Sequence, residues 1–137
     1  MRAWRAWIPA GAYMALIFTI SSLSLRRAHL PRNSDKLIHF VEYGVLALLV
    51  TYAWRRTRRQ WSARRAAVWA WLFAAAYGAT DEVHQLFVPY RSCSLYDWLA
   101  DATGAALAAA LLALVWKKHH KESPSVPDDP AVPRQAP

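Results

Sequence analysis

The sequence predicts an all-α, polytopic membrane protein with four transmembrane helices and both termini in the cytoplasm. The chain has 137 residues, of which 55% are hydrophobic, and eight of them are Trp. Its apolar residues fall into four runs, each about as long as the roughly 20-residue helix that crosses a bilayer. A soluble helical bundle is the alternative. Four Ala-, Leu- and Trp-rich runs, however, leave almost no polar face for the surface of such a bundle.

The four helices lie within one predicted domain, residues 1–120, and their expected ranges are about 4–25, 35–54, 64–88 and 95–116. The first helix is longer than the apolar core of a signal peptide. No convincing small-x-small cleavage site precedes Arg26, so we expect this helix to be retained. Residues 121–137 contain five of the eight prolines and no apolar periodicity, which predicts a disordered, Pro-rich cytoplasmic tail.

Polar residues mark where the second and fourth helices begin. Ser34 can cap the second helix, and Asp35 follows in its first turn, where a carboxylate interacts favourably with the helix dipole. Ser94 and Asp97 have the spacing of a capping box at the start of the fourth helix. Pro89 keeps the preceding loop from being helical.

Each helix contains a single glycine. In the fourth helix, Gly104 is four residues from both Ala100 and Ala108, a small-xxx-small pattern that lets helices approach closely in lipid. We expect helix packing, rather than contact with a ligand, to explain the glycines.

The distribution of positive charge predicts the orientation. Eleven Lys and Arg residues fall on the side shared by the N-terminus, the loop between the second and third helices, and the end of the fourth helix: Arg2, Arg5, Arg55, Arg56, Arg58, Arg59, Arg64, Arg65, Lys117, Lys118 and Lys121. Five lie on the opposite side: Arg26, Arg27, Arg32, Lys36 and Arg91. The positive-inside rule therefore places both termini in the cytoplasm.

The net charge of +8 could also indicate a nucleic-acid-binding protein, but the cations cluster at helix ends in the manner of a membrane protein. We therefore expect no nucleic-acid partner. Anionic lipid of the inner leaflet is the expected partner of the Arg55–Arg65 loop. Cys93 is the only cysteine, so the chain has no internal disulfide and no cysteine metal motif.

Acidic residues are unusually frequent close to, or inside, the three later apolar segments. There are six of them: Asp35, Glu42, Asp81, Glu82, Asp97 and Asp101. Helical spacing arranges them in stripes with other polar residues, because side chains three, four or seven positions apart share a face. The stripes are Asp35, His39 and Glu42, then Asp81 and Gln85, then Asp97, Asp101 and Gly104. In lipid, such stripes must face one another or water.

The predicted topology places three of these acids at one depth. Glu42 is seven residues inside the second helix, Asp81 is seven residues before the end of the third, and Asp101 is six residues inside the fourth. At 1.5 Å per residue, each lies roughly 10 Å from the outer surface. We therefore expect a polar cavity open to the outside and floored by Glu42, Asp81 and Asp101.

Structural roles are the alternative for the same residues. Asp35 and Asp97 could serve only as helix caps, and Lys36 and Arg91 could be ordinary interface cations. The deeper acids could form a buried polar network that holds the helices together. A bundle can be held together with less desolvation by Ser, Thr or Asn, which favours a functional role for the deep acids.

Three segments resemble the motifs of the VanZ-like family. Residues 35–43 (DKLIHFVEY) resemble D-K-x-x-H-x-x-x-Y, and residues 81–91 (DEVHQLFVPYR) resemble D-E-x-x-Q-x-F-x-P-x-R. Residues 97–104 (DWLADATG) resemble D-x-x-x-N-x-x-G, with Asp101 where Asn is usual. The resemblance covers about residues 5–115. It implies a small multi-pass protein of the bacterial cytoplasmic (inner) membrane, from a family linked to low-level teicoplanin resistance.

The leading functional hypothesis is a protein that acts on or modifies a cell-envelope lipid or a glycopeptide-target precursor from the outer leaflet. The candidate catalytic residues are Glu42, Asp81, Glu82, His39 and Asp101. The candidate substrate-binding residues are Lys36, Arg91, Gln85, Asp35, Tyr43 and Asp97. Lys36 and Arg91 can hold a phosphate or carboxylate, and Glu42, Asp81 or Glu82 can act as a general base. A divalent cation could be held by Asp81, Asp101 and His39, although no spacing is diagnostic of a metal.

Two other functions remain open. One is non-enzymatic binding of an envelope lipid, or support of a partner protein, in which the rim residues matter more than the deep acids. The other is proton-coupled transport. Against transport, the ionisable residues of the helices lie in the outer half, whereas a transporter normally carries a relay across the midplane.

Overall fold

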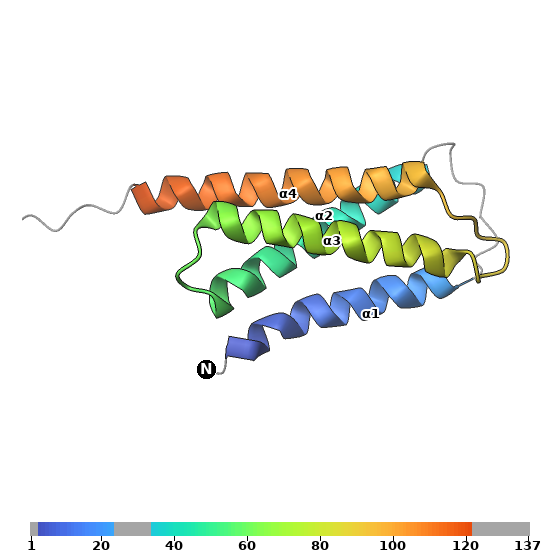
Figure 1. Cartoon of the computed structure of the whole chain (residues 1–137), viewed down its shortest axis with the longest axis horizontal. Coiled ribbons are helices and arrows are strands. Elements are labelled where there is room, and N and C mark those ends of the chain that lie inside the picture. The colour runs from blue at the N-terminus through green and yellow to red at the C-terminus, as the bar shows by residue number, and fades with distance from the viewer. Residues whose placement is uncertain (1–2, 24–33, 122–137) are drawn as a thin grey trace, which may run out of the picture.

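The described part of the chain is all-α. The computed structural model describes residues 3–23 and 34–121, with side chains as far as Lys118, and these ranges contain no strand. The elements are a 3₁₀ helix, η1 (Ala3–Trp7), and four α-helices: α1 (Ile8–Ser22), α2 (Ser34–Thr57), α3 (Ala63–Gln85) and α4 (Leu95–Lys121). They form an elongated bundle in which the α2–α3 loop and the end of α4 lie at one end and the α3–α4 loop lies at the other (Figure 1).

The number of helices agrees with the sequence prediction, but some of their ends differ. The first helix begins as η1, and α4 continues to Lys121 instead of ending near residue 116. The third helix ends at Gln85 rather than at Val88. Val88 precedes Pro89, and the residue before a proline avoids the helical conformation. The chain therefore leaves the helix in a turn, in which the Val88 amide donates to the Gln85 carbonyl, and Tyr90 has a positive φ of 65°.

Two of the described helices are long and apolar enough to cross a membrane, Ser34–Thr57 and Leu95–Lys118. The α1 helix alone has 15 residues. With η1 it covers residues 3–22, which corresponds to roughly 32 Å at the rises of the two helix types. The α3 helix has 23 residues but carries charged residues near both of its ends. Lys121, predicted as the first residue of the tail, is the last residue of α4, and residues 122–137 and 24–33 lie outside the described residues.

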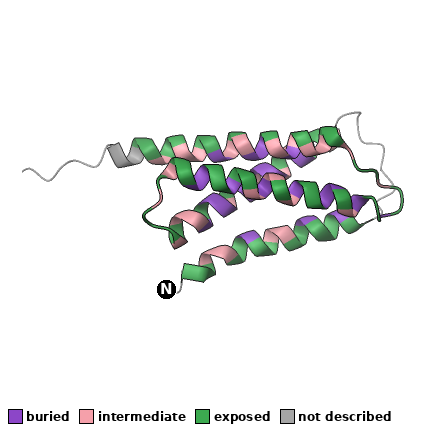
Figure 2. Ribbon diagram, in the orientation of Figure 1, coloured by how far each residue is buried: buried purple, intermediate pink, exposed green. Residues whose placement is uncertain are grey.

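The core lies where α2, α3 and α4 pack against one another. Its larger buried side chains come from α2, with Ile17 from α1, whereas α3 and α4 contribute mainly alanines such as Ala70, Ala74, Ala105 and Ala109. Buried residues therefore line the inner faces of the helices, and the outer faces are exposed (Figure 2). Small side chains on α3 and α4 bring the helix backbones close together.

The closest approach is between α2 and α4, at Gly104. A Cβ atom added at Gly104 would overlap the carbonyl oxygen of Phe40 and would lie only 2.7 Å from its carbonyl carbon. On the other side of the contact, Gly44 lies against the Gly104 backbone. This confirms the helix-packing role predicted for Gly104, because no larger residue fits there without moving the two helices apart.

We predict that Gly104→Ala destabilises the bundle by about 1–3 kcal/mol, the usual range for overpacking a tight contact. The measurement is the free energy of unfolding of the purified protein in detergent. Gly11→Ala is the matched control, because a Cβ at Gly11 would meet nothing within 4 Å. Equal stabilities for the two variants would contradict the close approach of α2 and α4.

Candidate functional site

Polar side chains from α2, α3 and α4 meet at the end of the bundle that carries the α3–α4 loop. At their centre, His39 Nδ1 and Asp101 Oδ1 are hydrogen-bonded at 2.9 Å, a contact that joins α2 to α4. His39 is 8% exposed and Asp101 is fully buried. Glu82 of α3 completes the group, because one potential ligand atom from each of the three residues lies within 4.8 Å of the others. We call His39, Glu82 and Asp101 the central triad.

Glu82 and Asp81 are both buried, and each uses only one carboxylate oxygen in a described hydrogen bond. Glu82 Oε2 accepts from the backbone amide of Ser94 at 2.6 Å, which fixes the loop that leads into α4. Asp81 Oδ2 accepts from Gln85 Nε2 at 3.1 Å, within α3. This second contact confirms that Asp81 and Gln85 share a helix face.

Three carboxylate oxygens of this cluster are buried without a hydrogen-bond partner among the described residues: Asp81 Oδ1, Glu82 Oε1 and Asp101 Oδ2. The hydroxyl of the fully buried Tyr43 is in the same state. Buried polar atoms in proteins almost always have a partner, and a missing partner costs on the order of 1–3 kcal/mol, more for a charged group. Such a concentration of unpartnered oxygens is typical of a site that takes a ligand, an ion or water.

Gly78 makes room for Asp101. A Cβ at Gly78 would lie 2.8 Å from Asp101 Oδ2 and 3.2 Å from a ring carbon of Tyr43. The sequence predicts only a packing role for Gly78, and its contact with a site carboxylate is additional. The spacing is consistent with this contact, since Gly78 precedes Asp81 and Glu82 by three and four residues and therefore shares their helix face.

Glu42 lies beside the central triad but is less buried. It is within electrostatic range of His39, Asp81 and Asp101 in the cluster, and of Tyr13 on α1. It makes no hydrogen bond or ion pair with any residue of the described segments, and it is half-buried. Glu42 is therefore the one acid of this cluster that is both accessible and free of such a bond.

The rim of the cluster is already paired. Lys36 Nζ and Asp97 Oδ1 form an ion pair at 3.2 Å between α2 and α4. Arg91 Nη2 donates to the Ile20 carbonyl at 3.4 Å, so the α3–α4 loop is also tied to α1. Asp35 lies in the first turn of α2, half-buried and with a contact of its own.

The structure refines two expectations about the acids. The possible cation site suggested from the sequence consisted of Asp81, Asp101 and His39. In the structure Glu82, not Asp81, lies with the other two, because one step along a helix turns a side chain by about 100°. The three deep acids also lie at less equal depths. Glu42 is roughly 12 Å from the helix end at Ser34, Asp81 roughly 6 Å from the end at Gln85, and Asp101 roughly 9 Å from the end at Leu95. The value for Asp81 is small because α3 ends earlier than predicted. The outward-facing cavity above them stays a prediction.

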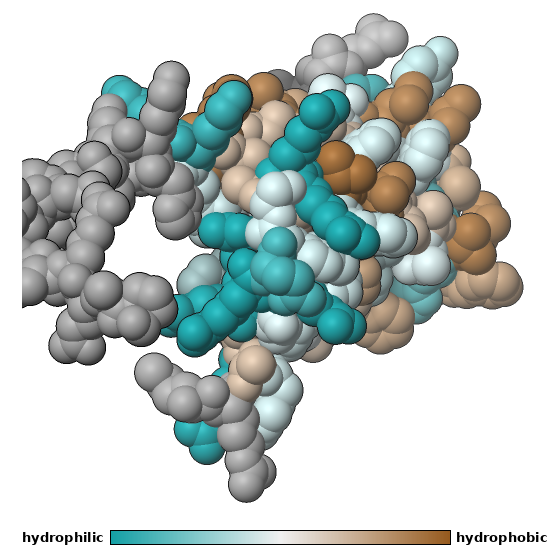
Figure 3. Space-filling model, turned by 60° about the vertical axis from the view of Figure 1, so that its left-hand side comes forward, coloured by the Kyte–Doolittle hydropathy of each residue, from teal (hydrophilic) through white to brown (hydrophobic). Residues whose placement is uncertain are grey.

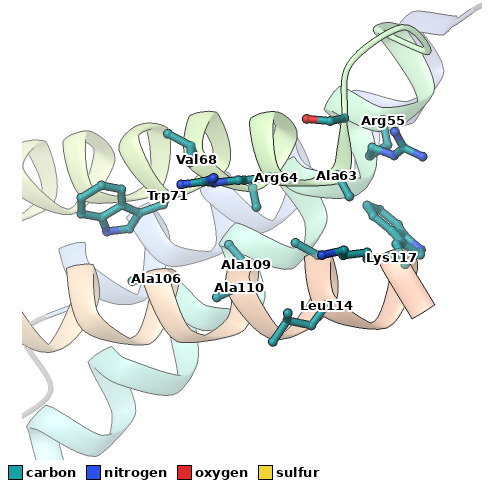
Figure 4. A pocket seen from close by; sticks show the side chains of 14 residues that line it. Arg55, Ala63, Arg64, Val68, Trp71, Ala106, Ala109, Ala110, Leu114 and Lys117 are labelled. Carbon is teal, nitrogen blue, oxygen red and sulfur yellow. The ribbon is translucent and has the colours of Figure 1, made fainter. Parts of the chain in front are cut away.

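A groove of about 850 Å³ lies at the other end of the bundle, between α3 and α4. Its walls are mostly alanines and other apolar residues, with cations at one end. Figure 4 shows Arg64 from α3 and Lys117 from α4 on opposite walls, and Trp71 further along. The groove is separate from the central triad, and sequence reasoning did not predict it, because no local pattern marks a space left between two Ala-rich helices.

A family model described as VanZ/LLP1 matches residues 5–116. The match spans all three motif segments and the whole of the polar cluster. No curated protein and no solved structure matches the chain.

We predict that Asp101→Ala lowers the free energy of unfolding by about 2–4 kcal/mol, because it leaves buried His39 without its hydrogen-bond partner and opens a small cavity. Asp97→Ala is the matched control on the same helix. Its ion-pair partner Lys36 is largely exposed, with 46% of the side chain accessible against 15% for Asp97, and we expect loss of the pair to cost less than about 1 kcal/mol. Unfolding in detergent measures both, and equal losses would show that the His39–Asp101 contact is not a structural centre.

Proposed function

The chain belongs to the VanZ/LLP1 family, and from this membership and the polar cluster we propose that it is a membrane protein that acts on the headgroup of a cell-envelope lipid. The single observation that carries the proposal is the group of buried carboxylate oxygens without partners, beside the accessible Glu42. Buried polar atoms are paired in the large majority of cases, so several unpaired carboxylate oxygens in one cluster favour a ligand over a purely structural role.

The outer surface of the bundle supports a lipid environment. Large apolar side chains are exposed along the described helices, among them Leu16, Phe18, Leu48, Leu72, Leu111 and Leu114. A soluble monomer rarely exposes apolar residues over so much of its surface. Together with the two long apolar helices, this favours an integral membrane protein.

We propose four spans with both termini in the cytoplasm of a bacterial cell. The cations of the α2–α3 loop and the end of α4 lie at one end of the bundle, and hydrophilic side chains gather there in Figure 3. Tryptophans accompany them: the rings of Trp54 and Trp61 stack at 4.9 Å, and the guanidinium groups of Arg65 and Arg55 lie over Trp61 and Trp116. A cationic end with an aromatic girdle is typical of a cytoplasmic membrane interface.

Anionic inner-leaflet lipid is the proposed partner of this end. The groove between α3 and α4 is apolar along its length and carries Arg55, Arg64 and Lys117. Its shape suits an acyl chain, with the phosphate held by the cations.

At the opposite end, Lys36 and Arg91 are the residues suited to an anionic headgroup, once it displaces their present contacts. Glu42 is then the proposed general base, because it has no hydrogen bond to give up and lies next to the cluster. The teicoplanin link of the VanZ-like family suggests that the lipid belongs to the pathway that glycopeptide antibiotics disturb.

Non-enzymatic binding is the second candidate, because part of the cluster has a structural role. The Lys36–Asp97 ion pair and the Glu82–Ser94 bond show that part of the cluster already holds helix ends together. On this alternative the protein holds an envelope lipid or a partner without changing it, and Lys36 and Arg91 matter more than Glu42.

The single cysteine tests the topology. Cys93 is exposed in the α3–α4 loop, so we expect a membrane-impermeant maleimide to label it in intact spheroplasts. As control, a Cys93→Ser, Gln60→Cys variant moves the thiol to the α2–α3 loop and should react only after the membrane is opened. Labelling in the reverse order would overturn the proposed orientation.

We predict that Glu42→Gln abolishes the effect of the protein on envelope lipids while leaving insertion and stability unchanged. Mass spectrometry of extracted lipids, from cells with the wild type, the variant or neither, checks this, together with teicoplanin susceptibility. Loss of a general base should lower the rate on the order of 10²-fold or more.

Thr103→Val is the matched control for this experiment, because the exposed Thr103 hydroxyl bonds only to its own helix. A lipid species that persists with Glu42→Gln would exclude Glu42 as the base. A wild-type profile equal to that of cells without the protein, with susceptibility altered by Lys36→Met or Arg91→Met, would favour non-enzymatic binding.

A further inference from the structure

We infer that the central triad binds a divalent transition-metal cation through His39, Glu82 and Asp101. The inference adds a cofactor to the site on which the proposed function rests. Metal binding can nevertheless be measured without any lipid reaction, so the two ideas can fail separately.

The spacing of the donor atoms fits one ion. Two ligands of the same ion are separated by at most twice the metal–ligand distance, which is roughly 4.2 Å for Zn²⁺. In a tetrahedral site the separation is roughly 3.4 Å. The three donor atoms lie within 4.8 Å of one another, so side-chain movements on the order of 1 Å close the site. His39 Nδ1 and Asp101 Oδ1 are 2.9 Å apart, which corresponds to about a right angle at an ion held by both. Such an ion would replace the hydrogen bond between them, with Nδ1 as the unprotonated nitrogen of the imidazole.

The unpartnered oxygens point independently to a ligand. Glu82 Oε1 and Asp101 Oδ2 have no hydrogen-bond partner in the described structure, and their residues are 3% and 0% exposed. The described cations at this end are engaged elsewhere, Lys36 with Asp97 and Arg91 with the Ile20 carbonyl. A cation is the partner that suits two buried carboxylate oxygens beside an imidazole.

Charge balance leads to the same partner. The triad holds two carboxylates and one imidazole, and Asp81 and Glu42 add two further acids nearby. With both triad carboxylates ionised, even a protonated His39 leaves a net negative charge away from water, which is costly unless a cation compensates it. A divalent cation neutralises both carboxylates of the triad.

The surrounding structure holds the three ligands in place. They come from three different helices, and Glu82 is fixed by the Ser94 amide at 2.6 Å. Gly78 leaves the space that the Asp101 carboxylate occupies. A site supported in this way from several elements is pre-organised, which favours tight binding.

The donor set selects the class of metal. One imidazole nitrogen with two carboxylate oxygens suits Zn²⁺ or Mn²⁺ better than Mg²⁺ or Ca²⁺, which prefer oxygen ligands alone. Three protein ligands leave a coordination position open, as in catalytic rather than structural zinc sites. An ion bound there would supply Lewis acidity to a headgroup oxygen or to water.

The test is metal binding by the full-length protein, purified in detergent and stripped with a chelator. The background carries His119→Gln and His120→Gln, so that neighbouring histidines at the end of α4 do not bind the probe. We expect calorimetry with Zn²⁺ to give one equivalent per chain, and Co²⁺ to give the visible absorption of a protein-bound ion. Added Zn²⁺ should also raise the unfolding temperature, because a ligand that binds the folded state stabilises it.

His39→Gln and Glu82→Gln should each weaken Zn²⁺ binding by more than about 10-fold. His84→Gln is the matched control, since it changes the same residue type as His39→Gln nearby and should leave the affinity unchanged. Circular dichroism shows whether each variant is folded, and having two independent ligand variants keeps the test valid if one is not. Absence of a saturable one-to-one site in the wild type, or unchanged affinity in folded His39→Gln or Glu82→Gln, would overturn the inference.

The same preparation separates the inference from the proposed function. Saturable Zn²⁺ binding that requires both His39 and Glu82 supports the metal site. This holds even where cells with Glu42→Gln have the same envelope lipids as cells with the wild type, a result that contradicts the proposed enzymatic function. Conversely, the protein could show no one-to-one Zn²⁺ site and turn over lipid at the same rate after chelation. That result would overturn the metal site and leave the proposed function intact.

Discussion

The backbone of α4 passes so close to the Phe40 carbonyl that only glycine fits at position 104. His39 precedes Phe40, and Asp101 lies one turn before Gly104, so this contact also sets the distance between the two residues at the centre of the polar cluster. If the two helices moved apart by the width of a methyl group, the His39–Asp101 hydrogen bond would be lost. The close packing of α2 and α4 at Gly104 and the geometry of the polar cluster therefore depend on each other.

The two ends of the bundle differ in how their charged groups are satisfied. At the cationic end, arginines lie over tryptophan rings. At the acidic end, the rim is paired but the deeper oxygens are not. Helix dipoles sharpen this contrast. Asp35 and Asp97 lie at helix N-termini, where a negative charge is favoured, whereas Asp81 and Glu82 lie near the C-terminus of α3, where it is not.

Much of the fold was accessible from the sequence, because helical spacing shows which residues share a face. It placed Asp81 with Gln85, and it identified Gly104 as a packing residue. It could not give the rotation of α3 about its axis, so it grouped Asp81 rather than Glu82 with His39 and Asp101. It also could not find the groove between α3 and α4, since an empty space depends on how two helices diverge and not on any local pattern.

The composition of α3 has a consequence for biogenesis. This helix carries arginines near its start and buried acids near its end, and it is not among the two that are apolar enough to cross a membrane. On the proposed four-span topology, its acidic end becomes sheltered only when α4 packs against it and brings Asp101 and the Ser94 amide. During synthesis α3 emerges from the ribosome before α4 does. Its stable integration therefore depends on a helix not yet made, so α3 and α4 are expected to enter the bilayer together as a hairpin.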